Sequence, residues 1–251
     1  MKILGVIPAR YDSTRFPGKP LHMINGKSMI QRVYEQAGKC RELTTVIVAT
    51  DHDLVEKHVN EFGGNVLMTS PDHRSGTERC AEALSVYLNS PGAEHIEIVV
   101  NIQGDEPFIH PEQISEVIHC FKTQSTQIAT LARKISRVEE LSDPNVVKLV
   151  FNLNKQVLYF SRSTIPFLRN VESREWIRHG EFYEHVGIYG FRTDILRQVV
   201  KLTETTLEKS ESLEQLRWLQ QGYPIMVHET AYESISIDTP ADLLKITNKT
   251  R

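Results

Sequence analysis

The sequence predicts an α/β fold with a mostly parallel central sheet, helices on both faces and a smaller antiparallel elaboration. Two observations predict it. Over the first hundred residues, short apolar runs alternate with amphipathic segments, which is typical of βαβ units. From about residue 126 onward, strand-like runs follow one another across turn residues, which favours antiparallel pairing.

The predicted parallel strands are apolar along their whole length, as strands covered on both faces must be. We expect them at 3–7, 45–50, 65–69 and 96–102. Helical patterns occupy the intervals near 28–40, 53–62 and 77–89. Right-handed crossovers place such helices on both faces. Ligands of open sheets bind at the carboxyl ends of the strands, so we expect functional residues there.

The second half of the chain contains predicted strands at 129–135, 146–152, 157–162, 187–192 and 224–229. Residues 152–156 resemble a hairpin connection. A helix is expected at 207–221, and a last helix after Pro240. Because no Pro/Gly/Ser-rich linker interrupts the chain, we expect one domain, 1–251, with one part at about 1–125 and another at about 126–251.

The composition excludes several classes of function. The net charge is −3 and there is no run of about five or six like charges, so we expect no nucleic-acid partner. Cys40, Cys80 and Cys120 form no C-x-x-C pair, so we predict neither a disulfide framework nor a zinc site. No run approaches roughly eighteen apolar residues. We therefore expect no membrane association and a cytoplasmic location.

Positive charge is concentrated at the start of the chain. Residues 1–41 hold eight lysines and arginines against two acidic residues, a net charge of +6. The loop Pro8–Pro20 supplies guanidinium, ammonium, hydroxyl and backbone N–H groups, which are the donors that a triphosphate requires. It contains neither a Walker A sequence nor G-x-G-x-x-G. A surface loop with incidental charge is the alternative.

Two acidic positions and one hydroxyl position each have a functional and a structural interpretation. Asp105 directly follows a predicted strand, where it suits Mg²⁺ or, equally, a turn or helix cap. Asp238 precedes Thr-Pro, and taken alone it fits a helix cap better than a metal ligand. Thr77 follows Gly76, and a helix N-cap is the simplest interpretation.

Eight ordered blocks together resemble the 3-deoxy-manno-octulosonate cytidylyltransferase (CMP-Kdo synthetase) family, and they span nearly the whole chain. The blocks are PARYDSTRFPGKPL at 8–21, ATDH at 49–52, HRSGTER at 73–79, NIQGDEP at 101–107, YFSRSTIP at 159–166, HVGIYGFR at 185–192, LEQLR at 213–217 and DTPADL at 238–243. The resemblance implies a Rossmann-like nucleotidyltransferase fold. It also implies a cytoplasmic homodimer that converts CTP and Kdo to CMP-Kdo and pyrophosphate for lipopolysaccharide biosynthesis.

The resemblance also implies roles for individual residues. The implied CTP-binding residues are Arg10, Ser13, Arg15, Lys19, Ser75 and Thr77. The residues implied to surround Kdo are Gln103, Arg162, His185, Tyr189, Glu214 and Gln215. Asp105 and Asp238 match the metal-binding carboxylates, with Mg²⁺ as the cofactor. The catalytic set, which neutralises phosphate charge, is then Arg10, Arg15, Lys19, Asp105 and Asp238.

The chain departs from the family pattern beside Asp238. Ser236-Ile237 replaces the common Gly-Val, and DTPAD replaces DTPED. Two alternatives stand beside the Kdo enzyme: a cytidylyltransferase for another acidic sugar, such as 8-amino-Kdo or sialic acid, and a non-catalytic nucleotide-binding regulatory protein.

Overall fold

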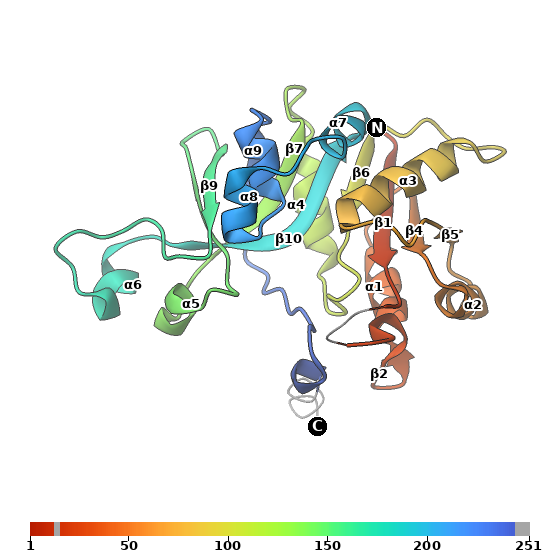
Figure 1. The fold of residues 1–251 in the computed structure, drawn as a ribbon, viewed down its shortest axis with the longest axis horizontal. Coiled ribbons are helices and arrows are strands. Elements are labelled where there is room, and N and C mark those ends of the chain that lie inside the picture. The colour runs from red at the N-terminus through yellow and green to blue at the C-terminus, as the bar shows by residue number, and fades with distance from the viewer. Residues whose placement is uncertain (13–15, 244–251) are drawn as a thin grey trace. The chain divides into compact units, whose positions relative to one another are not determined.

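The computed structural model describes residues 1–12 and 16–243, which divide into two compact units (Figure 1). The first unit comprises residues 1–115 and the last segment of the chain, from Ser234. The second comprises residues 116–233. Within the described ranges, no helix is both long and apolar enough to cross a membrane.

The first unit is built on a four-stranded parallel sheet with the strand order β6-β1-β4-β5. These strands are β1 (Ile3–Ala9), β4 (Thr45–Thr50), β5 (Val66–Met68) and β6 (Ile98–Asn101). All of the pairings are parallel, as predicted. A short antiparallel pair, β2 (Met23–Ile24) and β3 (Lys27–Ser28), follows the 3₁₀ turn η1 (Lys19–Leu21).

Three helices connect these strands: α1 (Met29–Ala37), α2 (Asp53–Glu61) and α3 (Gly76–Leu88), which lies across β1 in Figure 1. The strand order runs from β1 outward to β5 and then returns to β6. Right-handed crossovers therefore place α1 and α2 on one face and α3 on the other. The strand order reverses between β1 and β6, which is where open sheets of this type bind ligands.

The N-cap of α3 is Ser75, so the structural alternative considered for Thr77, a helix cap, is not what the structure shows. The Ser75 hydroxyl accepts a hydrogen bond from the Glu78 N–H, with N···O 3.2 Å. Thr77 lies inside the helix and is buried. Ser75 and Thr77 both carry a hydroxyl group that can cap a helix. With Ser75 as the cap, the helix starts at Gly76, which packs on Pro8.

The second unit has the strand order β11-β7-β10-β8-β9. Its strands are β7 (Ile128–Lys134), β8 (Lys148–Phe151), β9 (Val157–Ser161), β10 (Tyr183–Arg192) and β11 (Ile225–Thr230). All of these pairings are antiparallel except β11 with β7. The β8–β9 hairpin closes through Asn152 N–H to the Gln156 carbonyl, at 2.8 Å. The predicted α/β fold with an antiparallel elaboration is confirmed.

The helix predicted at 207–221 is in fact two helices. The helices of the second unit are α5 (Val138–Ser142), α6 (Trp176–His179) after the 3₁₀ turn η2 (Ser173–Glu175), α7 (Thr193–Val199), α8 (Thr206–Glu211) and α9 (Gln215–Gln220). Ser212 takes a left-handed conformation (φ 51°) and ends α8. Arg162 stabilises this break by donating to the carbonyls of Glu211 and Ser212. α4 (Pro111–Cys120), which the sequence analysis missed, joins the two units in the chain.

The ends of β1 and β6 approach each other so closely that a side chain does not fit between them. A Cβ atom on Gly104 would lie 2.6 Å from the carbonyl oxygen of Pro8, which is backbone and cannot rotate away. A Cβ atom on Gly76 would lie 3.2 Å from the Pro8 ring. Gly104 and Gly76 therefore allow the segment after β6 and the start of α3 to pack against the carboxyl end of β1.

We expect Gly104→Ala to destabilise the fold by about 1–3 kcal/mol, because the added methyl group forces the two strand ends apart. Urea unfolding measures this change. Gly38→Ala is the matched control: Gly38 is helical (φ −63°), the nearest atom to its added Cβ is at 3.3 Å, and its effect should stay within about 1 kcal/mol. Equal stability of Gly104→Ala and the wild type would contradict the close-approach argument.

Candidate active site

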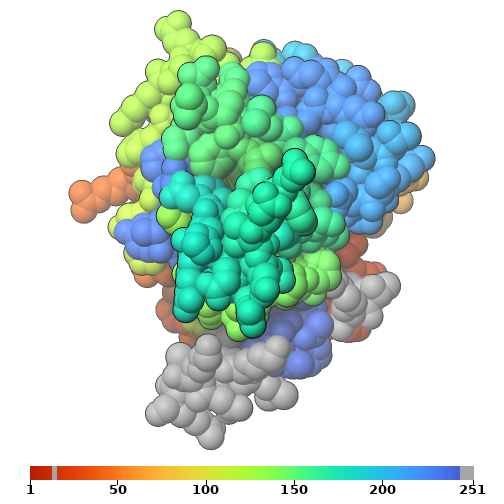
Figure 2. Space-filling view, turned by 90° about the vertical axis from the view of Figure 1, so that its left-hand side faces the viewer, coloured from red at the N-terminus to blue at the C-terminus, as the bar shows by residue number. Residues whose placement is uncertain are grey.

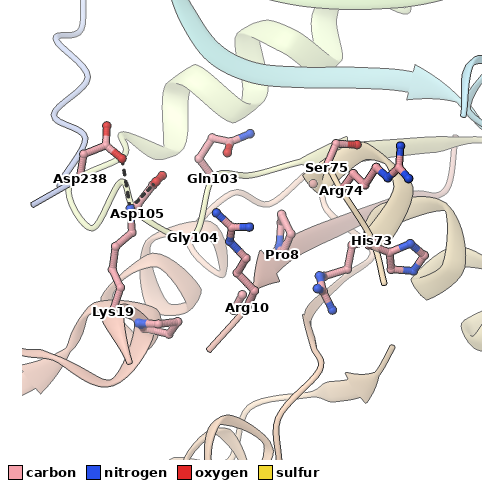
Figure 3. Close-up of a pocket in the computed structure, with 14 residues that line it drawn as sticks. Pro8, Arg10, Lys19, His73, Arg74, Ser75, Gln103, Gly104, Asp105 and Asp238 are labelled. Atoms are coloured by element: carbon pink, nitrogen blue, oxygen red, sulfur yellow. Dashed lines mark hydrogen bonds and ion pairs between the residues drawn. The ribbon is translucent and has the colours of Figure 1, made fainter. Parts of the chain in front are cut away.

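A pocket of about 230 Å³ lies at the carboxyl end of the first unit's sheet (Figure 3). It is formed by the end of β1, the segment after β6, the start of α3 and two residues from η1. Its lining residues are Pro8, Ala9, Arg10, Lys19, Pro20, His73, Arg74, Ser75, Gly76, Arg79, Gln103, Gly104, Asp105 and Asp238. Six residues predicted for the site therefore lie together: Arg10, Lys19, Ser75, Gln103, Asp105 and Asp238.

Lys19 and two carboxylates form the charged centre of the pocket. The Lys19 Nζ atom lies 2.7 Å from Asp105 Oδ2 and 3.4 Å from Asp238 Oδ1. Figure 3 shows both carboxylates directed at the same ammonium group. The lysine side chain is only 16% exposed, so these contacts are partly shielded from water. Oxygens from residues more than a hundred positions apart thus converge on one point.

Asp238 is brought to this point by its neighbours. The Ile237 N–H donates to the Asp105 carbonyl oxygen at 3.0 Å. The Ile237 side chain is fully buried and packs with Phe16, Ile24 and Met29. The isoleucine that departs from the family pattern therefore anchors the segment, whereas Ser236 is exposed.

The capping role considered for Asp238 belongs to its neighbour Thr239. The Thr239 hydroxyl accepts from the Asp242 N–H at 3.4 Å, and Asp242 Oδ2 accepts from the Thr239 N–H at 3.0 Å. These reciprocal bonds make the start of the final helix at Pro240 a capping box. The Asp238 carboxylate is left to face the pocket.

The remaining pocket wall suits an anion. Arg10 and Arg74 line the pocket with exposed side chains. The N-terminus of the thirteen-residue helix α3 also opens into it, and such a terminus carries partial positive charge. Thr77 is buried and is not among the lining residues. Ser13 and Arg15 lie outside the described residues.

Asp105 and Asp238 fit the requirements of a magnesium site. Mg²⁺ is usually held by one or two carboxylates together with substrate phosphates and water. The two carboxylates already converge on one cation, the Lys19 ammonium. In the described part of the chain, no group of three or more His, Cys, Asp or Glu side chains could form a complete protein cage. The arrangement therefore matches a metal that completes its coordination with a ligand.

In the second unit, His185 and Tyr189 on β10 form an uncharged polar pair with ring centroids 5.2 Å apart. Burial lowers the pKa of His185 to about 3. Its Nε2 atom lies 3.0 Å from the Thr130 hydroxyl, which also lies within hydrogen-bond distance of the Val186 and Ile188 carbonyl oxygens. A neutral imidazole offers one donor and one acceptor nitrogen.

Tyr189 is buried, and its hydroxyl has no hydrogen-bond partner among the described residues. Burial, followed by the Glu214 carboxylate, raises the pKa of Tyr189 well above its usual value. The hydroxyl is therefore protonated at neutral pH and can donate. A buried donor without a partner is costly to a protein unless a ligand satisfies it.

Arg162, Glu214 and Gln215 lie near the α8–α9 junction of the same unit. The Arg162 guanidinium donates to three backbone carbonyls, those of Pro144, Glu211 and Ser212. This side chain therefore shapes the turn that precedes Glu214 and Gln215, the latter of which is buried. Its guanidinium is engaged by backbone, whereas the Tyr189 hydroxyl is not.

Three pocket residues with basic side chains had no predicted role: His73, Arg74 and Arg79. All three belong to the block HRSGTER, from which only Ser75 and Thr77 were chosen. Arg74 immediately precedes the α3 N-cap, and Arg79 lies one turn after it. The helical periodicity of this block was the available signal, since residues 75 and 79 lie on one face of a helix.

Comparisons with known proteins agree with this geometry. The family model described as cytidylyltransferase matches residues 4–234. A 3-deoxy-manno-octulosonate cytidylyltransferase of Parabacteroides distasonis is 50% identical over 249 residues, covering 98% of this chain and 96% of that protein. The Bacteroides thetaiotaomicron protein of the same name is 50% identical over 246 residues, covering 97% and 96%.

Solved structures give the same result. A CMP:2-keto-3-deoxy-manno-octonic acid synthetase complexed with CTP superposes with a TM-score of 0.90 at 40% identity, covering 100% of this chain and 98% of that one. A cytidylyltransferase of Leptospira borgpetersenii superposes with a TM-score of 0.61 at 15% identity, covering 100% and 95%, which supports the fold alone.

We expect His185 to make the fold less stable in acid. In the unfolded chain its pKa returns to the ordinary value of 6.5. Above pH 6.5 both states are neutral; below it, only the unfolded state gains the proton, so stability falls by up to about 1.4 kcal/mol per pH unit. Urea unfolding at pH 7 and 4.5 should show a smaller loss for His185→Gln than for the wild type. Identical losses would contradict the low pKa.

Proposed function

Because the chain belongs to the cytidylyltransferase family, and within it to the 3-deoxy-manno-octulosonate cytidylyltransferases, we propose that it converts CTP and Kdo to CMP-Kdo and pyrophosphate. The observation that carries this proposal is the pocket itself. Cationic side chains, a helix N-terminus and two convergent carboxylates meet at the carboxyl end of β1 and β6. A binding site for a metal-bound nucleoside triphosphate requires positive groups for the phosphates and carboxylates for the metal.

The reaction is a phosphoryl-group substitution. The anomeric hydroxyl of Kdo attacks the α-phosphorus of CTP in line; a new P–O bond forms, and the bond to the pyrophosphate leaving group breaks. Positioning and charge neutralisation account for most of the catalysis in this chemistry. Arg10, Lys19, Arg74 and the start of α3 are among the described groups that supply positive charge. Family resemblance adds Ser13 and Arg15 to the CTP-binding set.

We assign the metal site to Asp105 and Asp238, with Mg²⁺ as the cofactor. Their convergence on the Lys19 ammonium supports this assignment. When bound, Mg²⁺ neutralises negative charge on the triphosphate. The two aspartates hold the cation, and Lys19 orients both carboxylates while remaining within reach of a phosphate oxygen.

The family resemblance assigns contacts with Kdo to Gln103 of the first unit. It also assigns such contacts to His185, Tyr189, Glu214 and Gln215 of the second unit. The neutral His185 and the protonated Tyr189 support this assignment, because uncharged donors and acceptors suit the hydroxyl groups of a sugar. Arg162 contributes by holding the turn before Glu214.

A homodimer is the assembly we propose, with the second unit contributing to the interface. Three large apolar side chains there are strongly exposed: Leu153, Leu158 at 60% and Phe167 at 74%. Leu158 lies on β9, an edge strand whose pairing ends at β8 in the described sheet. Figure 2 shows the green to teal segment that contains β9 and α6 at the molecular surface. Exposed apolar edges of this kind favour association.

A cytoplasmic location and a role in lipopolysaccharide biosynthesis complete the proposal. All three cysteines are free, which suits a reducing compartment. The pathway follows from the product, since an activated Kdo is consumed by a glycosyl transfer.

A pyrophosphate-release screen tests the function. Four nucleoside triphosphates are offered against Kdo, 8-amino-Kdo and sialic acid, with and without Mg²⁺. We expect release with CTP, Kdo and Mg²⁺ together. Release with another sugar only would assign the chain to a different acceptor, and no release from a folded protein would support a non-catalytic binding protein.

Asp105→Ala is expected to lower kcat/KM by about 100- to 1000-fold while the fold remains intact, because one of the two carboxylates for the cation is lost. Steady-state kinetics at saturating Mg²⁺ and a thermal melt measure both properties. Asp53→Ala, on the exposed start of α2 in the same unit, is the control and should keep near-normal turnover. Near-normal turnover of Asp105→Ala would reject the metal role.

A further inference from the structure

A buried ion pair lies beside the pocket and has no role in the function proposed above. The Arg79 NH2 atom donates to Asp51 Oδ2 at 2.7 Å, and the two side chains are 4% and 12% exposed. The other terminal nitrogen, NH1, donates to the Thr69 hydroxyl at 2.6 Å and to the Ser70 carbonyl at 3.3 Å. Although Arg79 lines the pocket, its terminal nitrogens are thus engaged within the protein.

The second oxygen of Asp51 holds the start of the loop Pro8–Pro20. Asp51 Oδ1 accepts from the Tyr11 N–H at 3.3 Å. The Tyr11 ring stacks on His52, with centroids 4.0 Å apart and planes 21° from parallel. The His52 ring is itself fixed, because its Nδ1 atom caps α2 by accepting from the Leu54 N–H at 3.1 Å. Residues 51 and 52 therefore fix both the backbone and the ring of Tyr11.

Tyr11 in turn holds the far end of the loop. Its carbonyl oxygen accepts from the Gly18 N–H at 3.0 Å. Gly18 has φ +65°, a left-handed conformation that favours glycine, and it directly precedes Lys19. A continuous series of contacts thus runs from Arg79 on α3, through Asp51 and Tyr11, to the residue before the lysine of the charged centre.

We propose that Asp51 and Arg79 are positioning residues that fix Tyr11 and, through it, Gly18 for CTP binding; this inference rests on the proposed function. A buried ion pair adds little net stability compared with apolar residues of similar size, so stability alone is a weak reason for it. The geometry of the pair gives a stronger reason, because the fork-shaped guanidinium of Arg79 can fix Asp51 while it also donates hydrogen bonds to Thr69 and Ser70. The pair acts on CTP through Tyr11, whose N–H donates to Asp51.

The test replaces the pair by apolar residues in Asp51→Leu/Arg79→Met, which keeps the interior filled and avoids an unpaired buried charge. We expect KM for CTP, and its Kd by calorimetry, to rise about 10- to 100-fold, since small misplacements of binding groups carry costs of this order. KM for Kdo should change by less than about twofold, as expected for independent sites. Arg79→Lys, which keeps the charge but loses the fork, should show a smaller rise in KM for CTP than the double variant.

The matched control is Glu208→Leu/Arg217→Met, a buried ion pair of the second unit with an N···O distance of 2.5 Å. It should leave KM for CTP unchanged even where it lowers the melting temperature. An unchanged KM for CTP in a folded Asp51→Leu/Arg79→Met protein would overturn the proposal. The proposal would also be overturned if activity fell equally with respect to CTP and Kdo, and by the same amount as in the control variant.

Two further outcomes are distinguished by the same experiment. If the double variant does not fold, Asp51→Asn is measured instead, with the same expected rise in KM for CTP and the same contradicting result. If the wild type releases no pyrophosphate, the proposed function fails. The calorimetric Kd for CTP then still decides whether the Asp51–Arg79 pair controls the loop.

Discussion

The backbone hydrogen bond from Ile237 to Asp105 is the interaction on which the candidate active site depends. It ties the last described segment of the chain to the turn that follows β6. The buried Ile237 side chain reinforces it, and the Asp238 carboxylate then faces Lys19 together with Asp105. Without this bond, two carboxylates separated by more than a hundred residues would have no reason to share one cation.

The two units carry different electrostatic properties. The pocket of the first unit collects arginine and lysine side chains, a helix N-terminus and two aspartates, which suits a charged, metal-bound triphosphate. The polar group on β10 of the second unit is neutral, because burial keeps His185 unprotonated and Tyr189 protonated. Sugar hydroxyl groups are recognised by such neutral donors and acceptors. Each set of side chains therefore matches one half of the proposed reaction.

Most strands could be predicted because each is a short apolar run bounded by turn residues; β4 was placed correctly at both ends. The errors have local causes. The helix expected at 207–221 breaks at Ser212, whose left-handed conformation depends on Arg162, some fifty residues away. Ser75 caps α3 in place of Thr77, and Thr239 caps the final helix in place of Asp238. In each case a long-range contact or an adjacent hydroxyl decided between two possible local structures.

The sequence by itself determined the α/β class, the positions of most strands and the family, because periodicity and ordered motifs are properties of the chain. It also identified Arg10, Lys19, Asp105 and Asp238 as candidates. Only the tertiary structure decided which of these side chains meet, and it added Arg79 and Asp51, which no motif had assigned a role. The reason is physical: convergence of side chains depends on long-range backbone bonds and close glycine contacts, and neither leaves a periodic signal in the sequence.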